Sequence, residues 1–284
     1  MSVNSSAEKL KIAISPCPND TFAFFHFIND YPEKYSVEFL DIEELNQGMM
    51  KNKWDMVKAS FTSGLLNTDY ELLPSGSAIG FGVGPVAVYA NEKIKTSSKW
   101  ITGLPGENTT ASFLWDYFVS HQINANQTPE IKNIEKKNMK FSEILDNVAS
   151  GKIDLGILIH EGRFVYQNYG LKLYIDLGEF WQNSTGYPVP LGGIFLKSNL
   201  AESVKTAVKN NLKYSVEKAI LEKNEKRKIY TDEIIPFIKK YSRESSQKII
   251  EQHIETYVTD DTVLLRKEAL DAIMYFRDLI KDKK

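Results

Sequence analysis

The sequence predicts an α/β fold with two related lobes, and three observations support this. Short apolar strands alternate with helices over residues 10–119, a pattern typical of α/β proteins with mainly parallel sheets. Residues 51–57 resemble residues 150–156, as expected for two similar halves. Hydrophobic residues make up 42% and charged residues 25% of the 284 residues, so the chain can bury cores for one or two domains.

The expected elements of the first half follow one another in order. Residues 10–14 alternate as a short strand, and the two prolines in residues 15–20 predict a turn. The aromatic residues 21–27 predict a helix, for which residues 19–21 offer N-caps. Further strands are expected at 35–42, 54–59, 85–89 and 99–104, and further helices at 43–51 and 109–119.

The repeat and the C-terminal segment complete the expected organisation. Each copy of the repeat combines a helix, a tight turn, an aspartate and an apolar strand. Copies this far apart favour two lobes over a solenoid, whose repeats are roughly 20–50 residues long. From residue 201 the apolar spacing becomes helical, with solvated Lys and Glu faces. Helices are expected at 201–223, 234–241, 245–257 and 264–280.

The strongest functional signal lies where the apolar strand at residues 154–159 ends. His160 follows that strand, and ligands of open α/β sheets bind beyond the carboxyl ends of strands. An imidazole with a pKa of about 6.5 is suited to general-base catalysis. We therefore interpret His160 as a base, with a structural histidine as the alternative. The other histidines, His26, His121 and His253, are interpreted as structural.

Several polar groups are candidates for ligand contacts, each with a simpler structural alternative. Glu161 and Arg163 either contact the substrate or form an ion pair that holds the loop. Residues 105–111 form a turn into a helix N-terminus, where free N–H groups suit a carboxylate or where ordinary capping occurs. Lys58 and Ser60 end the third strand and supply a cation and a hydroxyl, or they are surface features.

Two further segments are interpreted as connections between the lobes. Residues 80–85 (GFGVGP) lack the dinucleotide-binding spacing and precede a strand, so they predict a backbone crossing or hinge. Residues 185–192 contain two prolines and predict a loop that returns the chain to the first lobe close to the cleft.

Composition excludes several classes of function. Cys17 is the single cysteine, which excludes an intrachain disulfide and a Cys-rich zinc site. A net charge of −2 gives no electrostatic reason to expect nucleic acid or an anionic membrane as a partner. The polar start has no apolar signal core, and no stretch is long enough to span a bilayer. These features predict a cytoplasmic protein.

Six motifs in order resemble those of the 1,4-dihydroxy-6-naphthoate synthases of the futalosine route to menaquinone. The match is collinear from about residue 10 to residue 200 and weaker through the C-terminal helices. The motifs are SPCPNDTF (15–22), GVGP (82–85), TTA (109–111), HEGRF (160–164), DLG (176–178) and residues 185–192.

This resemblance implies a periplasmic-binding-protein type II fold with two lobes around a central cleft. The expected larger lobe comprises residues 1–95 and 193–284, and the smaller lobe residues 96–192. The family converts cyclic de-hypoxanthine futalosine, a small-molecule carboxylate, to 1,4-dihydroxy-6-naphthoate by carbon–carbon cleavage. It needs no known cofactor or metal. A homodimer is left open.

The resemblance also implies roles for residues of this sequence. The family's catalytic base falls on His160. Its substrate-contact positions fall on Lys58, Ala59 and Ser60 and on Thr110 and Ala111. Within the first and fourth motifs, Asn19 and Arg163 are further candidates for substrate contacts.

Two other functions remain as alternatives. Chorismate dehydratase, from the same pathway, shares the implied fold, and the His160 motif favours the naphthoate synthase over it. A solute-binding protein of this fold would bind a small anion without chemistry, and the base-like histidine argues against it.

Overall fold

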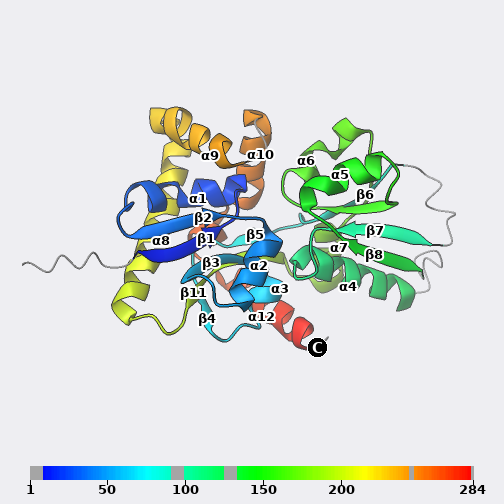
Figure 1. The fold of residues 1–284 in the computed structure, drawn as a ribbon, viewed down its shortest axis with the longest axis horizontal. Helices are drawn as coiled ribbons and strands as arrows, with labels where there is room; N and C mark the ends of the chain where they lie inside the picture. The colour runs from blue at the N-terminus through cyan, green and yellow to red at the C-terminus, as the bar shows by residue number, and fades with distance from the viewer. Residues whose placement is uncertain (1–8, 91–98, 125–132, 243–245, 283–284) are drawn as a thin grey trace, which may run out of the picture.

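The computed structural model describes residues 9–90, 99–124, 133–242 and 246–282, which form two lobes that lie side by side (Figure 1). The first sheet has the strand order β2–β1–β3–β11–β4, with β5 paired to β11. Its strands are β1 (Leu10–Ile14), β2 (Tyr35–Phe39), β3 (Met56–Ser60), β4 (Tyr70–Leu72), β5 (Ala78–Gly80) and β11 (Val189–Lys197).

The second sheet has the order β10–β6–β9–β7–β8. Its strands are β6 (Val86–Tyr89), β7 (Trp100–Leu104), β8 (Ile134–Asn138), β9 (Leu155–Leu158) and β10 (Lys172–Asp176).

Helices cover both sheets and extend the first lobe. The first lobe carries α1 (Pro18–Asn29), α2 (Ile42–Met50), α3 (Phe61–Gly64), α8 (Glu202–Asn224), the π-helical turn η4 (Tyr230–Ile234), α9 (Ile235–Tyr241), α10 (Gln247–Tyr257), α11 (Asp260–Val263) and α12 (Lys267–Asp282). The second lobe carries α4 (Thr110–Asn124), α5 (Phe141–Ala149), α6 (Gly162–Val165), the 3₁₀ turn η3 (Tyr166–Tyr169) and α7 (Leu177–Thr185). Among the described helices, none is both long enough and apolar enough to cross a membrane.

The internal repeat corresponds to equivalent positions of the two sheets. Asp55 accepts a hydrogen bond from the backbone of Lys11 in β1, and Asp154 accepts the same bond from Ile101 in β7, both at 2.8 Å. In each sheet three strands pair in parallel in the same order, β2–β1–β3 and β8–β7–β9. The carboxyl ends of β3 and β9 are therefore equivalent positions in the two lobes.

Three details of the expected fold are corrected by the structure. The pairing is mixed, because β11 is antiparallel to β3, β4 and β5, and β6 is antiparallel to β9 and β10. Helix α1 begins at Pro18, because proline fits the first helical position, where its missing N–H has no partner to lose. The expected loop at 185–192 is partly strand, since β11 includes Pro190 beside an irregularity in its pairing with β5.

The two connections between the sheets lie close together. Residues 81–85 join β5 of the first sheet to β6 of the second, which confirms the predicted crossing, and the chain returns at Val189 beside Gly80. Because β6 already belongs to the second sheet, the first crossing precedes residue 86; the expected lobe boundary between residues 95 and 96 lies outside the described residues.

The outgoing crossing passes so close to α7 that only glycine fits there. A Cβ on Gly178 would lie 2.2 Å from the carbonyl carbon of Val83 and 2.3 Å from the amide nitrogen of Gly84. Both obstacles are backbone atoms, so the crossing itself would have to shift. Gly84 and the next residue, Pro85, line the pocket described below, so this contact fixes one wall of the pocket.

We expect Gly178→Ala to destabilise the protein by about 1–3 kcal/mol, the usual cost of overpacking a tight site. Urea denaturation followed by circular dichroism measures this loss. The matched control is Asn183→Ala, at an exposed position of the same helix, which should leave the midpoint nearly unchanged. Equal midpoints for the two variants would contradict the close approach.

Candidate active site

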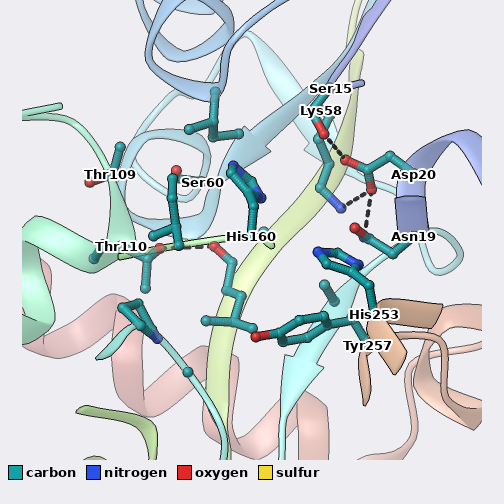
Figure 2. A pocket seen from close by; sticks show the side chains of 18 residues that line it. Ser15, Asn19, Asp20, Lys58, Ser60, Thr109, Thr110, His160, His253 and Tyr257 are labelled. Atoms are coloured by element: carbon teal, nitrogen blue, oxygen red, sulfur yellow. Dashed lines mark hydrogen bonds and ion pairs between the residues drawn. The ribbon is translucent and has the colours of Figure 1, made fainter. Parts of the chain in front are cut away.

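One pocket collects residues from both lobes at the carboxyl ends of their strands (Figure 2). The first lobe contributes the end of β1, the start of α1 and the end of β3. The second contributes the two residues after β9, Ile159 and His160, and the start of α4. Among the residues proposed from the sequence, the pocket wall includes Asn19, Lys58, Ser60, Thr110, Ala111 and His160.

A buried carboxylate organises the first-lobe side of the pocket. Asp20 accepts hydrogen bonds from Ser15 Oγ at 2.5 Å and from Asn19 Nδ2 at 2.9 Å. It also forms an ion pair with Lys58, whose Nζ lies 2.7 Å from Oδ1. Asp20 and Lys58 are 3% and 4% exposed, so each charge is neutralised by the other in a region with little water. The shorter contact of the Lys58 ammonium is therefore the one with Asp20. Its second contact is a hydrogen bond to the Gly76 carbonyl oxygen at 3.3 Å.

His160 is held in an unusual backbone conformation at the end of β9. Its φ of 55° lies in the left-handed region, which non-glycine residues seldom adopt outside turns and functional sites. This conformation turns the chain abruptly from β9 into α6. The ring of Phe141 packs against the imidazole in an edge-to-face contact at 5.0 Å between centroids.

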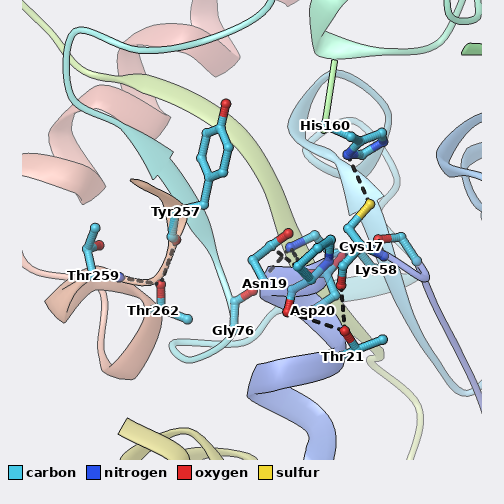
Figure 3. Close-up of polar contacts among 12 residues, drawn as sticks. Cys17, Asn19, Asp20, Thr21, Lys58, Gly76, His160, Tyr257, Thr259 and Thr262 are labelled. Carbon is cyan, nitrogen blue, oxygen red and sulfur yellow. Dashed lines mark hydrogen bonds and ion pairs between the residues drawn. The ribbon is translucent and has the colours of Figure 1, made fainter. Parts of the chain in front are cut away.

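The imidazole of His160 contacts the only cysteine of the chain. Nδ1 of His160 lies 2.9 Å from Sγ of Cys17, across 143 positions of sequence and between the two lobes (Figure 3). Burial, with smaller effects of the Asp20 and Glu161 carboxylates, raises the pKa of the Cys17 thiol well above its usual value. Cys17 is therefore a neutral thiol, which either donates its S–H hydrogen bond to Nδ1 or accepts a hydrogen bond from Nδ1–H.

The start of α4 faces the same pocket. Thr109 caps the helix, because its hydroxyl accepts the N–H of Ser112 at 3.2 Å. Thr110 Oγ1 donates to the Leu191 carbonyl oxygen at 2.9 Å, which ties the helix start to β11. The N–H groups of Thr110 and Ala111 belong to the first turn, where an α-helix provides no internal acceptor.

Two residues proposed from the sequence lie outside this pocket wall. Arg163 forms an ion pair with Asp176 at 2.6 Å and donates to the Gly84 carbonyl oxygen at 2.8 Å. These two contacts brace the crossing, and the ion pair that holds the loop includes Asp176. Ala59 is fully buried in the core, since alternation along β3 turns it away from its pocket-lining neighbours Lys58 and Ser60.

The pocket also contains residues that the sequence did not indicate. His253 and Tyr257 reach it from α10, one helical turn apart. Burial raises the pKa of Tyr257 to about 12, so its hydroxyl stays protonated. The helical pattern alone could not show which face of α10 points to the second lobe. The sequence did contain one signal that could have identified these residues: His253 and Tyr257 are spaced by one helical turn on a face of α10 that is otherwise apolar.

Contacts between α2 and the turn before α4 join the two lobes. Glu43 on α2 accepts hydrogen bonds from the backbone N–H and the side-chain Nδ2 of Asn108, at 3.1 and 2.6 Å. Asn46 donates to the Asn108 carbonyl oxygen at 3.1 Å. Within the described residues, no group of three or more His, Cys, Asp or Glu side chains is arranged to hold a metal ion.

Comparison of the sequence with known proteins identifies the family to which this chain is similar. A family model described as menaquinone biosynthesis matches residues 10–282. A Streptomyces coelicolor protein named 1,4-dihydroxy-6-naphtoate synthase is 32% identical over 94% of this chain and 91% of its own length. A Thermus thermophilus protein of the same name is 31% identical over 88% of this chain and 86% of its own.

Solved structures agree with the fold that the motifs implied. A crystal structure of an Archaeoglobus fulgidus protein is 27% identical, with a TM-score of 0.83 over 99% of this chain and 98% of that chain. The periplasmic aliphatic sulphonate binding protein SsuA of Escherichia coli is 11% identical and shares the fold alone, with a TM-score of 0.63 over 97% of this chain and 87% of that chain. The two-lobed periplasmic-binding-protein-like fold is thus confirmed, and the match over residues 10–282 shows that this chain belongs to the menaquinone biosynthesis family.

Proposed function

We propose that this protein is a 1,4-dihydroxy-6-naphthoate synthase, a carbon–carbon lyase that acts on cyclic de-hypoxanthine futalosine with His160 as general base. Two relatives above 30% identity carry the synthase name, which favours it over chorismate dehydratase. The observation that carries the proposal is that His160, held in a left-handed backbone conformation, lines the same pocket between the two lobes as the N-terminus of α4.

The contact with Cys17 assigns separate tasks to the two ring nitrogens of His160. When Nδ1–H donates to the neutral Cys17 sulfur, Nε2 carries the lone pair that removes a proton from the substrate. The positive charge that then develops on the imidazole is compensated by the carboxylate of the neighbouring residue, Glu161. Loss of the sugar-derived fragment restores an aromatic ring, which drives the cleavage forward.

The two lobes place equivalent helices at the pocket, but only one is suited to a carboxylate. Helix α1 carries Asp20 in its own first turn, so its positive end already faces a negative charge. Helix α4 has no acidic residue in its first turn. The substrate carboxylate therefore binds at Thr110 and Ala111, where backbone N–H groups and the helix dipole favour an anion.

We expect His160→Asn to fold normally and to lose on the order of 10²–10⁴-fold in kcat, because asparagine tolerates the left-handed backbone but cannot act as the base. Turnover of the cyclic substrate, followed by mass spectrometry of the naphthoate product, measures the loss. The wild-type protein incubated with chorismate should give no product. Near-wild-type turnover by the variant would show that the base is another residue.

A pair of variants at Thr110 tests the carboxylate site. Thr110→Val removes the hydroxyl, whereas Thr110→Pro removes the hydroxyl and the backbone N–H, and proline is accepted at the first helical position. A hydrogen bond to a charged group contributes about 1.5–3 kcal/mol, so we expect product affinity to be on the order of 10–100-fold weaker in Thr110→Pro than in Thr110→Val. Isothermal titration calorimetry with 1,4-dihydroxy-6-naphthoate measures both, and equal affinities would exclude this N–H as a carboxylate ligand.

Substitutions of Cys17 test whether it positions the base. Cys17→Ala leaves Nδ1 of His160 without this contact, so we expect kcat to fall about tenfold, the effect of losing roughly 1.4 kcal/mol of orientation, with little change in KM. Cys17→Ser keeps a group that can accept the hydrogen bond from Nδ1–H and should recover most of the rate. A purely structural cysteine would instead give two variants that differ in thermal stability but share the wild-type kcat.

A further inference from the structure

His253 is as buried as a structural histidine, but it lacks the hydrogen bonds that a structural histidine normally makes. It lies on α10, is 1% exposed and lines the pocket. Figure 2 shows its ring between Asn19 and Tyr257, on the first-lobe side and across the pocket from His160. Among the described residues, neither ring nitrogen has a hydrogen-bond partner.

Another buried histidine of the same lobe provides the contrast. His26 is also 1% exposed, and its two nitrogens lie 2.7 Å from Glu222 and 3.4 Å from Asp30. A buried polar group without a partner costs about 1–3 kcal/mol, and most such groups in folded proteins are paired. The fold provides carboxylate partners for both nitrogens of His26. It provides none for the nitrogens of His253, which can therefore bind a ligand that enters the pocket.

Aromatic packing fixes the orientation of the His253 ring. The Phe164 ring, which comes from the second lobe, lies 5.8 Å from it, and the Tyr257 ring lies 4.9 Å from it. These contacts hold the imidazole by its faces and edges without using its nitrogens. The ring is therefore preorganised to meet a ligand, which avoids a cost of reorientation when the ligand binds.

The charge state of His253 limits what it can do. Burial, together with His160 and Lys58, lowers its pKa well below the usual value, so the ring is neutral at neutral pH. A neutral imidazole offers one N–H donor and one acceptor. It is a weak proton source, but it can stabilise negative charge by hydrogen bonding, as a neutral histidine does in triosephosphate isomerase.

We propose that His253 is a second catalytic imidazole, whose ring N–H binds the substrate oxygen on which negative charge develops. In this step His160 takes a proton from a substrate hydroxyl, and the freed O–H electron pair forms the new carbonyl of the departing fragment as the carbon–carbon bond breaks. The electron pair of the broken carbon–carbon bond moves onto the oxygen beside His253. The proton held by His160 then returns to the product, so no oxidant, reductant or other co-reactant is required. This inference rests on the proposed lyase function and adds a stabiliser opposite the base.

His253→Phe tests the proposal, because the phenyl ring preserves the contacts with Phe164 and Tyr257 and removes only the nitrogens. We expect kcat to fall on the order of 10²–10³-fold, the usual effect of deleting one donor to a developing anion, with a much smaller change in KM. The melting temperature should stay the same or rise, because two buried unpaired nitrogens are gone. The matched control is His121→Phe, an exposed ring packed on Tyr117 and Phe180, which should retain full activity.

If His253→Phe misfolds, the proposal can still be tested with a second variant and with a measurement on the wild-type protein. His253→Gln keeps a donor of similar reach and should recover part of the kcat lost in His253→Phe. In the wild-type protein, labelling its four histidines with ¹⁵N allows the His253 ring signals to be followed during titration with 1,4-dihydroxy-6-naphthoate. A product-induced shift of these signals is expected, and unchanged signals under saturating product would overturn the proposal.

The outcomes separate this inference from the proposed function. If the wild-type protein does not convert the cyclic substrate, the lyase assignment fails. If the wild-type protein converts it and His253→Phe matches the wild-type kcat, the lyase assignment stands and the role of His253 is wrong.

Discussion

The buried ion pair between Asp20 and Lys58 is the contact on which the rest of the pocket depends. It joins the start of α1 to the end of β3, and through Ser15 it also holds the end of β1. Each charge would be costly to bury alone, and removing one partner of a buried pair typically costs about 3–5 kcal/mol. Because the pair neutralises itself, this side of the pocket adds little net charge. The N-terminus of α4, by contrast with that of α1, has no acidic residue in its first turn.

The two lobes share one pattern of strands but use it differently. The aspartates of the repeat bind the neighbouring strand in the same way in both lobes, at Asp55 and Asp154. Beyond these equivalent strands the first lobe places the hydrogen-bonded set Ser15, Asp20 and Lys58, whereas the second places His160, with its left-handed backbone, and the N-terminus of α4. A symmetrical framework therefore carries two different sets of pocket residues.

Local patterns allowed much of this structure to be predicted from the sequence. The apolar run before His160 indicated both a strand and the placement of the imidazole at its end, and the 201–223 pattern predicted α8 closely. Strand direction was not predictable, because β11 joins the first sheet only after the chain has left the second lobe. Cys17 and His253 were missed for a related reason. Their importance comes from contacts with His160 and with Phe164, which lie far away in sequence and meet only in the folded protein.

The position of β11 also determines the order in which the lobes can form during synthesis. All strands of the second sheet lie between residues 86 and 176, so this sheet is complete before β11 leaves the ribosome. The first sheet cannot close until residues 189–197 insert between β3 and β4, although β1 to β5 were made first. Such long-range closure is slow and leaves strand edges exposed meanwhile. The lobe that begins the chain is thus the last to be finished, and β3 and β4 wait for their shared partner strand until most of the chain has been made.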